Sequence, residues 1–205
     1  MRPGSIVSMC VLSGLSAWLV FASWSNPFRW NRTLLGGTVP PVAAGGGPGP
    51  REASMDLVSS DFPAGGAIPR GFTEDGGDLS PALAWTGAPE GTQAFALIVD
   101  DPDAPSGRWV HWVCYDLPGN QSALVRGQAQ GPSLAGGGKQ GRNGWGRLGW
   151  NGPAPPPGKP HRYVFKLYAL ARPLGLDSGA GAGQVEAAMA GKVLGQGQVL
   201  GIYGR

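Results

Sequence analysis

Three apolar segments, residues 94–99, 108–117 and 162–170, constrain the fold more than any other feature of the sequence. Each contains aromatic and β-branched residues and lies close to glycine, proline or aspartate, a combination that is typical of β-strands. Residues 94–99 are apolar without interruption, so we expect a strand that is buried on both faces. Together the three segments predict the central strands of a β-sheet.

Weaker signals surround these segments. Residues 55–59 alternate between apolar and polar, which predicts a first strand, and residues 83–85 and 198–203 predict two further strands. Residues 184–194 carry apolar residues at helical spacing, which predicts one amphipathic helix. Residues 119–160 contain many glycines and no periodic pattern, so we expect long Gly/Pro-rich loops with a functional role. Because strands outnumber helices, the sequence predicts a mainly β domain.

Glycine and proline are abundant, with 37 and 20 residues, yet the composition is not that of a disordered chain. Hydrophobic residues make up 41% of the sequence, and 8 tryptophans, 6 phenylalanines and 4 tyrosines provide a core. Residues 53–205 are therefore expected to form one folded domain. Residues 26–52 are rich in glycine and proline and are expected to be a disordered linker. Within residues 1–25, the apolar segment 6–24 predicts either a signal peptide, with export to the periplasm or the medium, or an uncleaved membrane anchor.

The net charge of +3 hides an uneven distribution along the chain. Residues 71–107 contain acidic residues and no Lys or Arg, whereas residues 117–176 contain basic residues and no Asp or Glu. Either the two segments pair across a folded surface, or the basic segment provides a positive field that attracts anions. The basic residues are not clustered as a nucleic-acid groove requires, so no nucleic-acid partner is expected.

The chain has 2 histidines, and each begins an apolar segment that follows a Pro/Gly-stiffened loop. Because side chains alternate along a strand, each histidine is expected to share a face with its alternate neighbours: Trp109, Val113 and Tyr115 for His111, and Tyr163, Phe165 and Leu167 for His161. If the two strands are neighbours, His111, His161 and Tyr163 meet at one end of the sheet. A carboxylate of the acidic turn 100–103, which precedes residue 109, could then reach either imidazole and orient it.

Such a group would form a small polar pocket for a phosphoryl or carboxylate group. An oriented imidazole provides one N–H, or a positive charge when it is protonated. Gly152 has no Cβ, so its backbone can approach a ligand closely, and glycine-rich loops bind anions through their N–H groups. The alternative is that each histidine is a satisfied core residue and that Asp101 only caps its own turn.

Other kinds of site find less support. Cys114 lies inside an apolar segment and is expected to be a core residue rather than a nucleophile. Two histidines and an aspartate match a facial metal triad in type, but the chain has no helical histidine pair, so neither a metal nor another cofactor is expected. The sequence contains no nucleophile elbow and no phosphate-binding loop of the P-loop type.

Three motifs in a fixed order make the sequence more specific. Residues 101–105 are DPDAP, residues 109–112 are WVHW, and residues 152–163 are GPAPPPGKPHRY. In this order they resemble the phosphatidylethanolamine-binding protein family, and most closely its bacterial Raf kinase inhibitor-like branch. The resemblance extends from about residue 53 to the end of the chain. It implies a large central β-sheet packed on a smaller one, with helical structure near the C-terminus.

The resemblance also implies a small anion pocket. By motif, its lining would consist of Asp101, His111, His161 and Tyr163, with Pro105 and Gly152 at the rim. Members of the family are binding proteins or modulators of kinases and proteases, and are not generally enzymes. This sequence departs from the family pattern at three positions: Val110, where the eukaryotic branch has another histidine; Ala154, where the bacterial branch has cysteine; and Trp150, where a small residue is usual.

We therefore predict a non-enzymatic binding protein for a phosphate-bearing small molecule or a lipid headgroup. One alternative is an inhibitor-like interaction protein that presents the Pro-rich loop 153–160 to a protease, a kinase or another enzyme. A further alternative is a metal-dependent hydrolase. If residues 6–24 are not cleaved, they would also tether the protein to a membrane.

Overall fold

The structure, a computed structural model, describes residues 52–205. The signal peptide or membrane anchor predicted for residues 1–25 lies outside the described residues, as does almost all of the linker predicted for residues 26–52. Both therefore stay predictions, and so does export. Within residues 52–205, no helix combines the length and the apolar character that a membrane-spanning helix requires.

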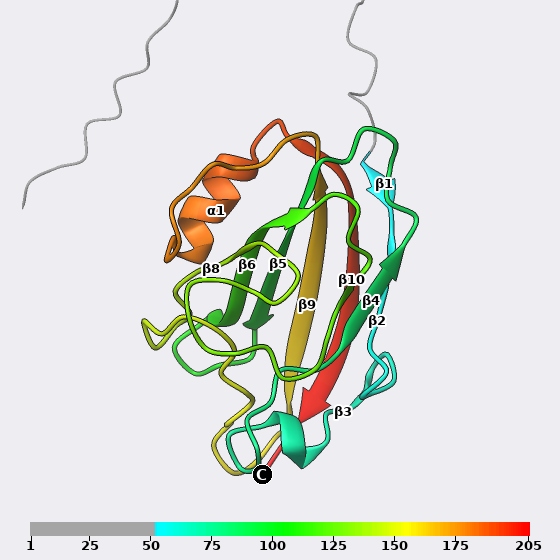
Figure 1. The fold of residues 1–205 in the computed structure, drawn as a ribbon. Coiled ribbons are helices and arrows are strands. Elements are labelled where there is room, and N and C mark those ends of the chain that lie inside the picture. Colours follow the sequence, from blue (N-terminus) through cyan, green and yellow to red (C-terminus); the bar gives the residue numbers. More distant parts are fainter. Residues whose placement is uncertain (1–51) are drawn as a thin grey trace, which may run out of the picture. The chain divides into compact units, whose positions relative to one another are not determined.

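A large mixed sheet of 7 strands forms the centre of the described domain (Figure 1). Its strands in chain order are β1 (Ala53–Ser54), β3 (Gly66–Ala67), β5 (Ala94–Asp101), β6 (Trp109–Pro118), β8 (Lys139–Gln140), β9 (His161–Leu170) and β10 (Val193–Tyr203). Their order in space is β1-β10-β9-β5-β6-β8, and β3 also pairs with β10. β1 and β3 run parallel to β10, and the other neighbours are antiparallel.

A smaller sheet of 3 strands packs against the large one. Its strands are β2 (Asp56–Val58), β4 (Leu83–Thr86) and β7 (Ala123–Leu124), in the order β2-β4-β7. Leu57 and Trp85 of the small sheet belong to the same buried cluster as Leu97 and Phe165 of the large sheet. The mainly β fold with a large and a smaller sheet is therefore confirmed.

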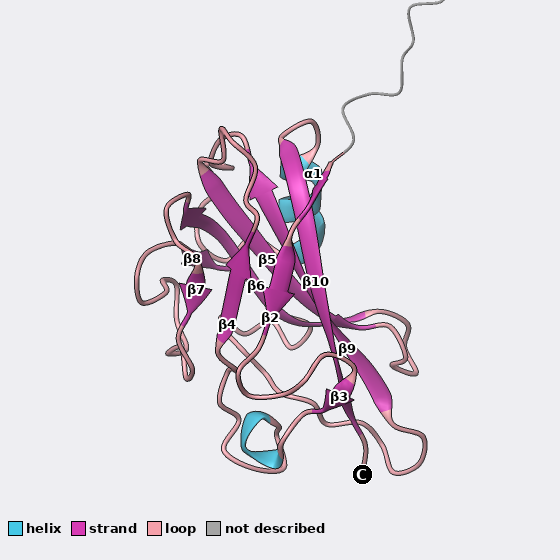
Figure 2. Ribbon diagram, turned by 90° about the vertical axis from the view of Figure 1, so that its right-hand side faces the viewer, coloured by secondary structure: helices cyan, strands magenta, loops and turns pink. Residues whose placement is uncertain are grey.

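The second face of the large sheet carries the helix α1 (Ala182–Met189), seen beside the sheet in Figure 2. Val185 of α1 packs with Ile98 of β5 and Val113 of β6 in a second buried cluster. Since one cluster lies on each face, β5 is buried along its whole length, as the uninterrupted apolar pattern predicted.

Some boundaries differ from the sequence prediction. The helix ends at Met189 instead of residue 194, because Val193 already pairs with Leu170 as the first residue of β10. The short 3₁₀ helix η1 (Arg70–Phe72) and the two-residue strands β1, β3, β7 and β8 were not predicted. These short elements depend on pairing with distant segments, which local patterns do not reveal.

β5 lies between β6 and β9, so the two histidine strands are not direct neighbours, the condition under which their side chains were expected to meet. Asp101 at the end of β5 pairs with Trp109 at the start of β6, and Asp100 pairs with Val164 near the start of β9. Because β5 is antiparallel to both strands, its end lies beside their beginnings. The two histidines are therefore brought to the same end of the sheet with one strand between them.

A β-bulge in β6 decides where His111 points. Val99 pairs with Trp112 and the next residue, Asp100, pairs with Val110. His111 is left without a partner on β5, as the extra residue of a bulge. A bulge interrupts the alternation of side chains, so residues on its two sides no longer keep a common register of faces.

The predicted face of His111 is wrong for this reason. Val113 and Tyr115 pack in the cluster beneath α1, on one face of the sheet. His111 lies on the other face, where its ring contacts that of Tyr163. A strict alternation would have placed His111 beneath α1, so the bulge is what turns it toward β9.

Candidate functional site

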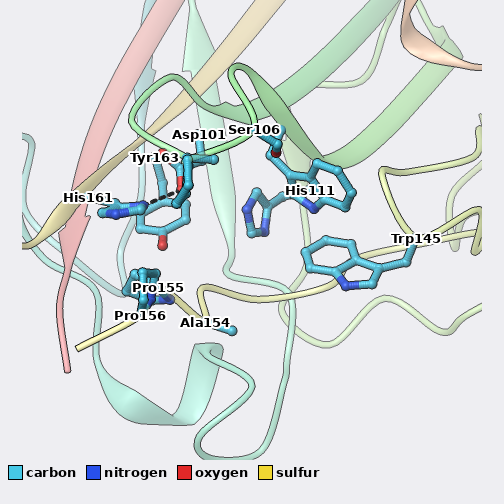
Figure 3. Close-up of a pocket in the computed structure, with 12 residues that line it drawn as sticks. Asp101, Ser106, His111, Trp145, Ala154, Pro155, Pro156, His161 and Tyr163 are labelled. Atoms are coloured by element: carbon cyan, nitrogen blue, oxygen red, sulfur yellow. Dashed lines mark hydrogen bonds and ion pairs between the residues drawn. The ribbon is translucent and has the colours of Figure 1, made fainter. Parts of the chain in front are cut away.

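A cavity of about 190 Å³ opens at this end of the large sheet (Figure 3). It is lined by the turn after β5, by the beginnings of β6 and β9, and by the long loop between β6 and β9: Asp101, Ala104, Pro105, Ser106, Trp109, His111, Trp145, Ala154, Pro155, Pro156, His161 and Tyr163. The volume is below the roughly 300–1,000 Å³ of sites for drug-sized ligands. The cavity therefore suits a small ligand or one headgroup of a larger molecule.

Asp101 fixes the orientation of His161. The Asp101 Oδ2 and His161 Nδ1 atoms are 2.7 Å apart, and both side chains are almost fully buried. The other carboxylate oxygen of Asp101 accepts the backbone N–H of Asp103 at 2.8 Å, which holds the carboxylate in place. Because an ionised carboxylate only accepts hydrogen bonds, the ring hydrogen lies on Nδ1, and Nε2 is left for a ligand.

A backbone carbonyl fixes His111 in the same way. Its Nδ1 lies 2.6 Å from the Asn151 carbonyl oxygen, which can only accept, so this nitrogen also carries the hydrogen. Burial lowers the pKa of His111 below its ordinary value, and the Asn151 carbonyl and the charge of Asp101 oppose this effect. At neutral pH the imidazole is therefore mainly uncharged, and its Nε2 presents a lone pair.

Tyr163 lies between the two histidines on the cavity wall. Its ring stands at 86° to that of His111, with 5.1 Å between the ring centroids. Burial, helped by the negative charge of Asp101, raises the pKa of the Tyr163 hydroxyl far above its usual value. The hydroxyl therefore remains protonated and is a permanent hydrogen-bond donor at this wall.

The wall opposite is a proline-rich segment that is held by its carbonyl groups. Pro153 and Pro155 have no N–H, so this backbone has few donors of its own. The Glu74 N–H donates to the Pro153 carbonyl at 3.1 Å, and Arg205 Nη1 lies 3.4 and 3.3 Å from the carbonyl oxygens of Ala154 and Pro155. The loop before β4 and the end of β10 therefore position the cavity wall.

The guanidinium of Arg205 is itself fixed by one carboxylate. Arg205 Nε and Nη2 donate to Asp75 at distances of 2.6–3.0 Å, and the Tyr203 hydroxyl donates to the same carboxylate at 2.8 Å. These donors lower the pKa of Asp75 to about 2, so the carboxylate is ionised over the whole physiological range. Asp75 and Arg205 therefore connect three segments that are distant in the sequence: the loop before β4, the end of β10 and the proline-rich wall of the cavity.

The model of the phosphatidylethanolamine-binding protein family matches residues 58–204. The chain belongs to this family. A UPF0098 protein of Aquifex aeolicus is 46% identical over 155 residues, which cover 75% of this chain and 90% of that protein. A UPF0098 protein of Methanothermobacter thermautotrophicus is 44% identical over 151 residues, 74% of this chain and 99% of that protein.

Solved structures of family members agree with the fold. The crystal structure of Escherichia coli YbcL, described as a new member of the mammalian PEBP family, superposes with a TM-score of 0.70 at 32% identity. That of the Chlamydia trachomatis protein CT736, described as a putative phosphatidylethanolamine-binding protein homologue, gives a TM-score of 0.68 at 32% identity. Each match covers 75% of this chain and 99% of the other. The family resemblance drawn from the three motifs is therefore confirmed.

Among the predicted site residues of this family member, Gly152 is the one that does not line the cavity. Its N–H donates to Asp78 Oδ1 at 2.6 Å, and a Cβ at this position would lie 2.5 Å from the Phe72 carbonyl oxygen. Gly152 is therefore a glycine because the loop before β4 packs against its backbone. The expectation that its backbone approaches a ligand finds no support in this arrangement.

Trp150, which departs from the family pattern, is a core residue beneath the cavity. It is 1% exposed and stacks on Phe165, with 5.8 Å between the ring centroids. Its ring lies 6.3 Å from that of His111 and does not line the cavity. The large side chain therefore supports His111 from below and takes no space from a ligand.

Two basic residues near the site, Arg162 and Lys166, are paired with carboxylates instead of facing the cavity. Arg162 binds Asp103 through two nitrogens at 2.8 Å, and Lys166 binds the buried Asp100 at 2.9 Å. None of the residues that line the cavity is Lys or Arg. Of the two interpretations of the charge distribution, pairing across the surface therefore accounts for these residues, and the only groups on the lining that can become cationic are the two histidines.

Two candidates from the sequence remain, the metal site and Cys114. Within residues 52–205, no three His, Cys, Asp or Glu side chains cluster closely enough to hold a metal ion. Cys114 is fully buried in the core, as predicted, and burial raises the pKa of its thiol well above the ordinary value.

Sequence reasoning missed several residues of the cavity. Ser106 and Trp145 line it, and Asn151 holds His111. Trp145 stands in the glycine-rich stretch 141–146, where a lone aromatic residue between glycines was a usable signal. Arg205 gave no signal, because its partners lie far away along the chain.

Proposed function

We propose that this protein is a non-enzymatic binding protein that takes the phosphoryl group of a small molecule or of a lipid headgroup. One observation carries the proposal: two imidazoles face one small cavity, and each has its Nδ1 already committed to an acceptor. The Nε2 atoms of His111 and His161 are therefore the free polar atoms of both rings. The hydroxyl groups of Tyr163 and Ser106 add two donors on the same lining.

The proposal has a definite pH dependence. A neutral imidazole with its hydrogen on Nδ1 offers only a lone pair at Nε2, which an unprotonated phosphate oxygen cannot bond. Protonation places an N–H on Nε2 and adds a positive charge, so both changes favour an anion. Anion binding should therefore take up protons and strengthen as the pH falls from 8 toward 6.

Isothermal titration calorimetry with inorganic phosphate tests the proposal. We expect binding at pH 6 that weakens at pH 8, and a loss of binding in His161→Gln. Arg172→Gln is the matched control, because it removes a basic residue that is exposed and does not line the cavity. Phosphate affinity that is unchanged in His161→Gln, or that falls equally in Arg172→Gln, would contradict the proposal.

A second proposal concerns a protein partner. Residues 156–160 are exposed, whereas residues 151–153 at the start of the same loop are buried, so the loop presents a rigid Pro-rich rim beside the cavity. Prolines restrict the backbone in advance, which lowers the entropic cost of binding. Binding of a partner that uses this rim should be lost when residues 156–160 are replaced by a Gly/Ser loop and should be retained in His161→Gln. Binding that survives the loop replacement and is lost in His161→Gln would contradict this proposal.

A further inference from the structure

A tight turn carries Trp145 at the mouth of the cavity, on the side opposite the Asp101–His161 pair (Figure 3). The buried Asn143 builds this turn. Its Oδ1 accepts the N–H groups of Trp145 and Arg147, both at 3.0 Å, and its Nδ2 donates to Asn151 Oδ1 at 2.8 Å. Trp145 is nevertheless 37% exposed. The indole is held firmly but remains in contact with solvent, so it contributes little to the core. Contact with a ligand would explain its position.

The glycine before Trp145 shows how closely the turn packs. A Cβ at Gly144 would lie 2.6 Å from Cε2 of Trp109, so any other residue would push the turn away from that ring. Trp145 and Trp109 consequently meet at an interplanar angle of 88°, with 5.4 Å between their centroids. The turn thus has a defined place against the start of β6.

Neighbouring aromatic rings of the cavity lining stand nearly perpendicular to one another. The Trp145 ring stands at 76° to that of His111, with 5.1 Å between centroids, and the His111 ring stands at 86° to that of Tyr163. Trp145 and Trp109 are also nearly perpendicular. Four aromatic rings from three segments therefore border one small cavity. Rings that stand at right angles can turn more than one face toward a single cation, as the rings of aromatic cages do.

The lining also places no competing cation beside Trp145. Asp101 lies on the opposite side, paired with His161, and no Lys or Arg lines the cavity. His111 is the ring nearest to Trp145, and burial lowers its pKa, so at neutral pH it adds no positive charge to this side. The cavity therefore has a polar side that suits a phosphoryl group and an aromatic side without a competing cation.

We propose that Trp145 and Trp109 form a subsite for a quaternary ammonium group, so that the ligand is a zwitterion of the phosphocholine type. The inference rests on the proposed phosphoryl site, because the phosphoryl group would lie at His161 and the ammonium group at Trp145. A trimethylammonium group has no N–H to satisfy, and the indoles offer ring faces and no hydrogen-bond acceptor. A primary ammonium is strongly hydrated and would lose hydrogen bonds on the same surface.

Calorimetry with four soluble ligands tests the subsite at pH 7, where His111 is uncharged. They are inorganic phosphate, phosphoethanolamine, phosphocholine, and the neutral isostere of phosphocholine in which a tert-butyl group replaces trimethylammonium. We expect phosphocholine to bind about tenfold more tightly than its neutral isostere, the size of a partly desolvated cation–π contact. It should also bind more tightly than phosphoethanolamine.

Variants of Trp145 distinguish the effect of its aromatic ring from the effect of its size. In Trp145→Leu the affinity ratio of phosphocholine to its isostere should fall to about one, and in Trp145→Phe a preference for the cation should persist. Val125→Ala removes an exposed apolar side chain away from the cavity and should leave the ratio as in the wild type. A ratio near one in the wild type, or a ratio unchanged in Trp145→Leu, would overturn the inference.

The same experiment distinguishes the two proposals. If inorganic phosphate binds and phosphocholine gains nothing, the quaternary ammonium subsite is refuted and the phosphoryl site stands. If no phosphate ligand binds, both are refuted. Co-sedimentation with phosphatidylcholine vesicles identifies the source of the headgroup: capture by vesicles assigns it to a lipid, and binding of soluble phosphocholine alone assigns it to a free metabolite.

Discussion

Gly152→Ala should lower the stability of the fold and disturb His111 at the same time. A Cβ at residue 152 would lie 2.5 Å from the Phe72 carbonyl oxygen and 2.7 Å from both Thr73 Cα and Asp78 Oδ1. Two of these atoms are backbone, and the third accepts the Gly152 N–H itself, so none can swing aside freely. Overpacking of this kind costs about 1–3 kcal/mol. In a protein of this size the loss corresponds to a decrease in Tm of about 2–12 °C.

Thermal denaturation of Gly152→Ala beside Gly183→Ala measures this effect. Gly183 lies in α1, and a Cβ there would meet nothing within 4 Å, so the control should be as stable as the wild type or gain up to about 1 kcal/mol. Because Asn151 holds His111, the imidazole signals of His111 should also move in ligand-free Gly152→Ala. If Gly152 served ligand approach instead, phosphate affinity would fall at an unchanged Tm. That result would refute the packing explanation.

Three further predictions concern the groups around the cavity. Asp101→Asn should weaken phosphate binding by roughly 10- to 100-fold in calorimetry, because a charge-assisted bond of about 1.5–3 kcal/mol no longer orients His161; an affinity within twofold of the wild type would argue against this role. Arg205→Ala should weaken phosphate binding several-fold with little change in Tm, because the exposed guanidinium holds the Pro155 wall and not the core; a large fall in Tm with unchanged affinity would contradict it. Burial lowers the pKa of His111 in the folded state, so below about pH 6.5 the unfolded chain binds the proton more readily and stability should fall with pH; urea denaturation at pH 7.5 and 5.5 should show this loss, and His111→Gln should reduce it.

The sequence alone predicted the parts of the site that depend on local patterns. The apolar segment 94–99 was sufficient to predict a strand buried on both faces, because no polar side chain interrupts it. The DPDAP motif and the two histidines predicted the residues that meet at the cavity. In each case the information lies within a few neighbouring residues.

What the sequence did not reveal depends on pairing between distant segments. The bulge at His111 exists only in relation to β5, and it reversed the predicted face. The position of β5 between β6 and β9 likewise follows from long-range pairing. The backbone of Gly152, which was expected to approach a ligand, lies against the segment at Phe72. Such contacts leave no periodic signal in the sequence.

An NMR titration of the imidazole groups with phosphate at pH 6 tests the central claim most directly. The protein has 2 histidines, so the assignment of the two sets of ring signals needs only one His→Gln variant. If both rings bind one anion through Nε2, the signals of His111 and His161 will shift together and give the same Kd. Signals that stay unchanged at millimolar phosphate, or that titrate with two different Kd values, would contradict a shared site.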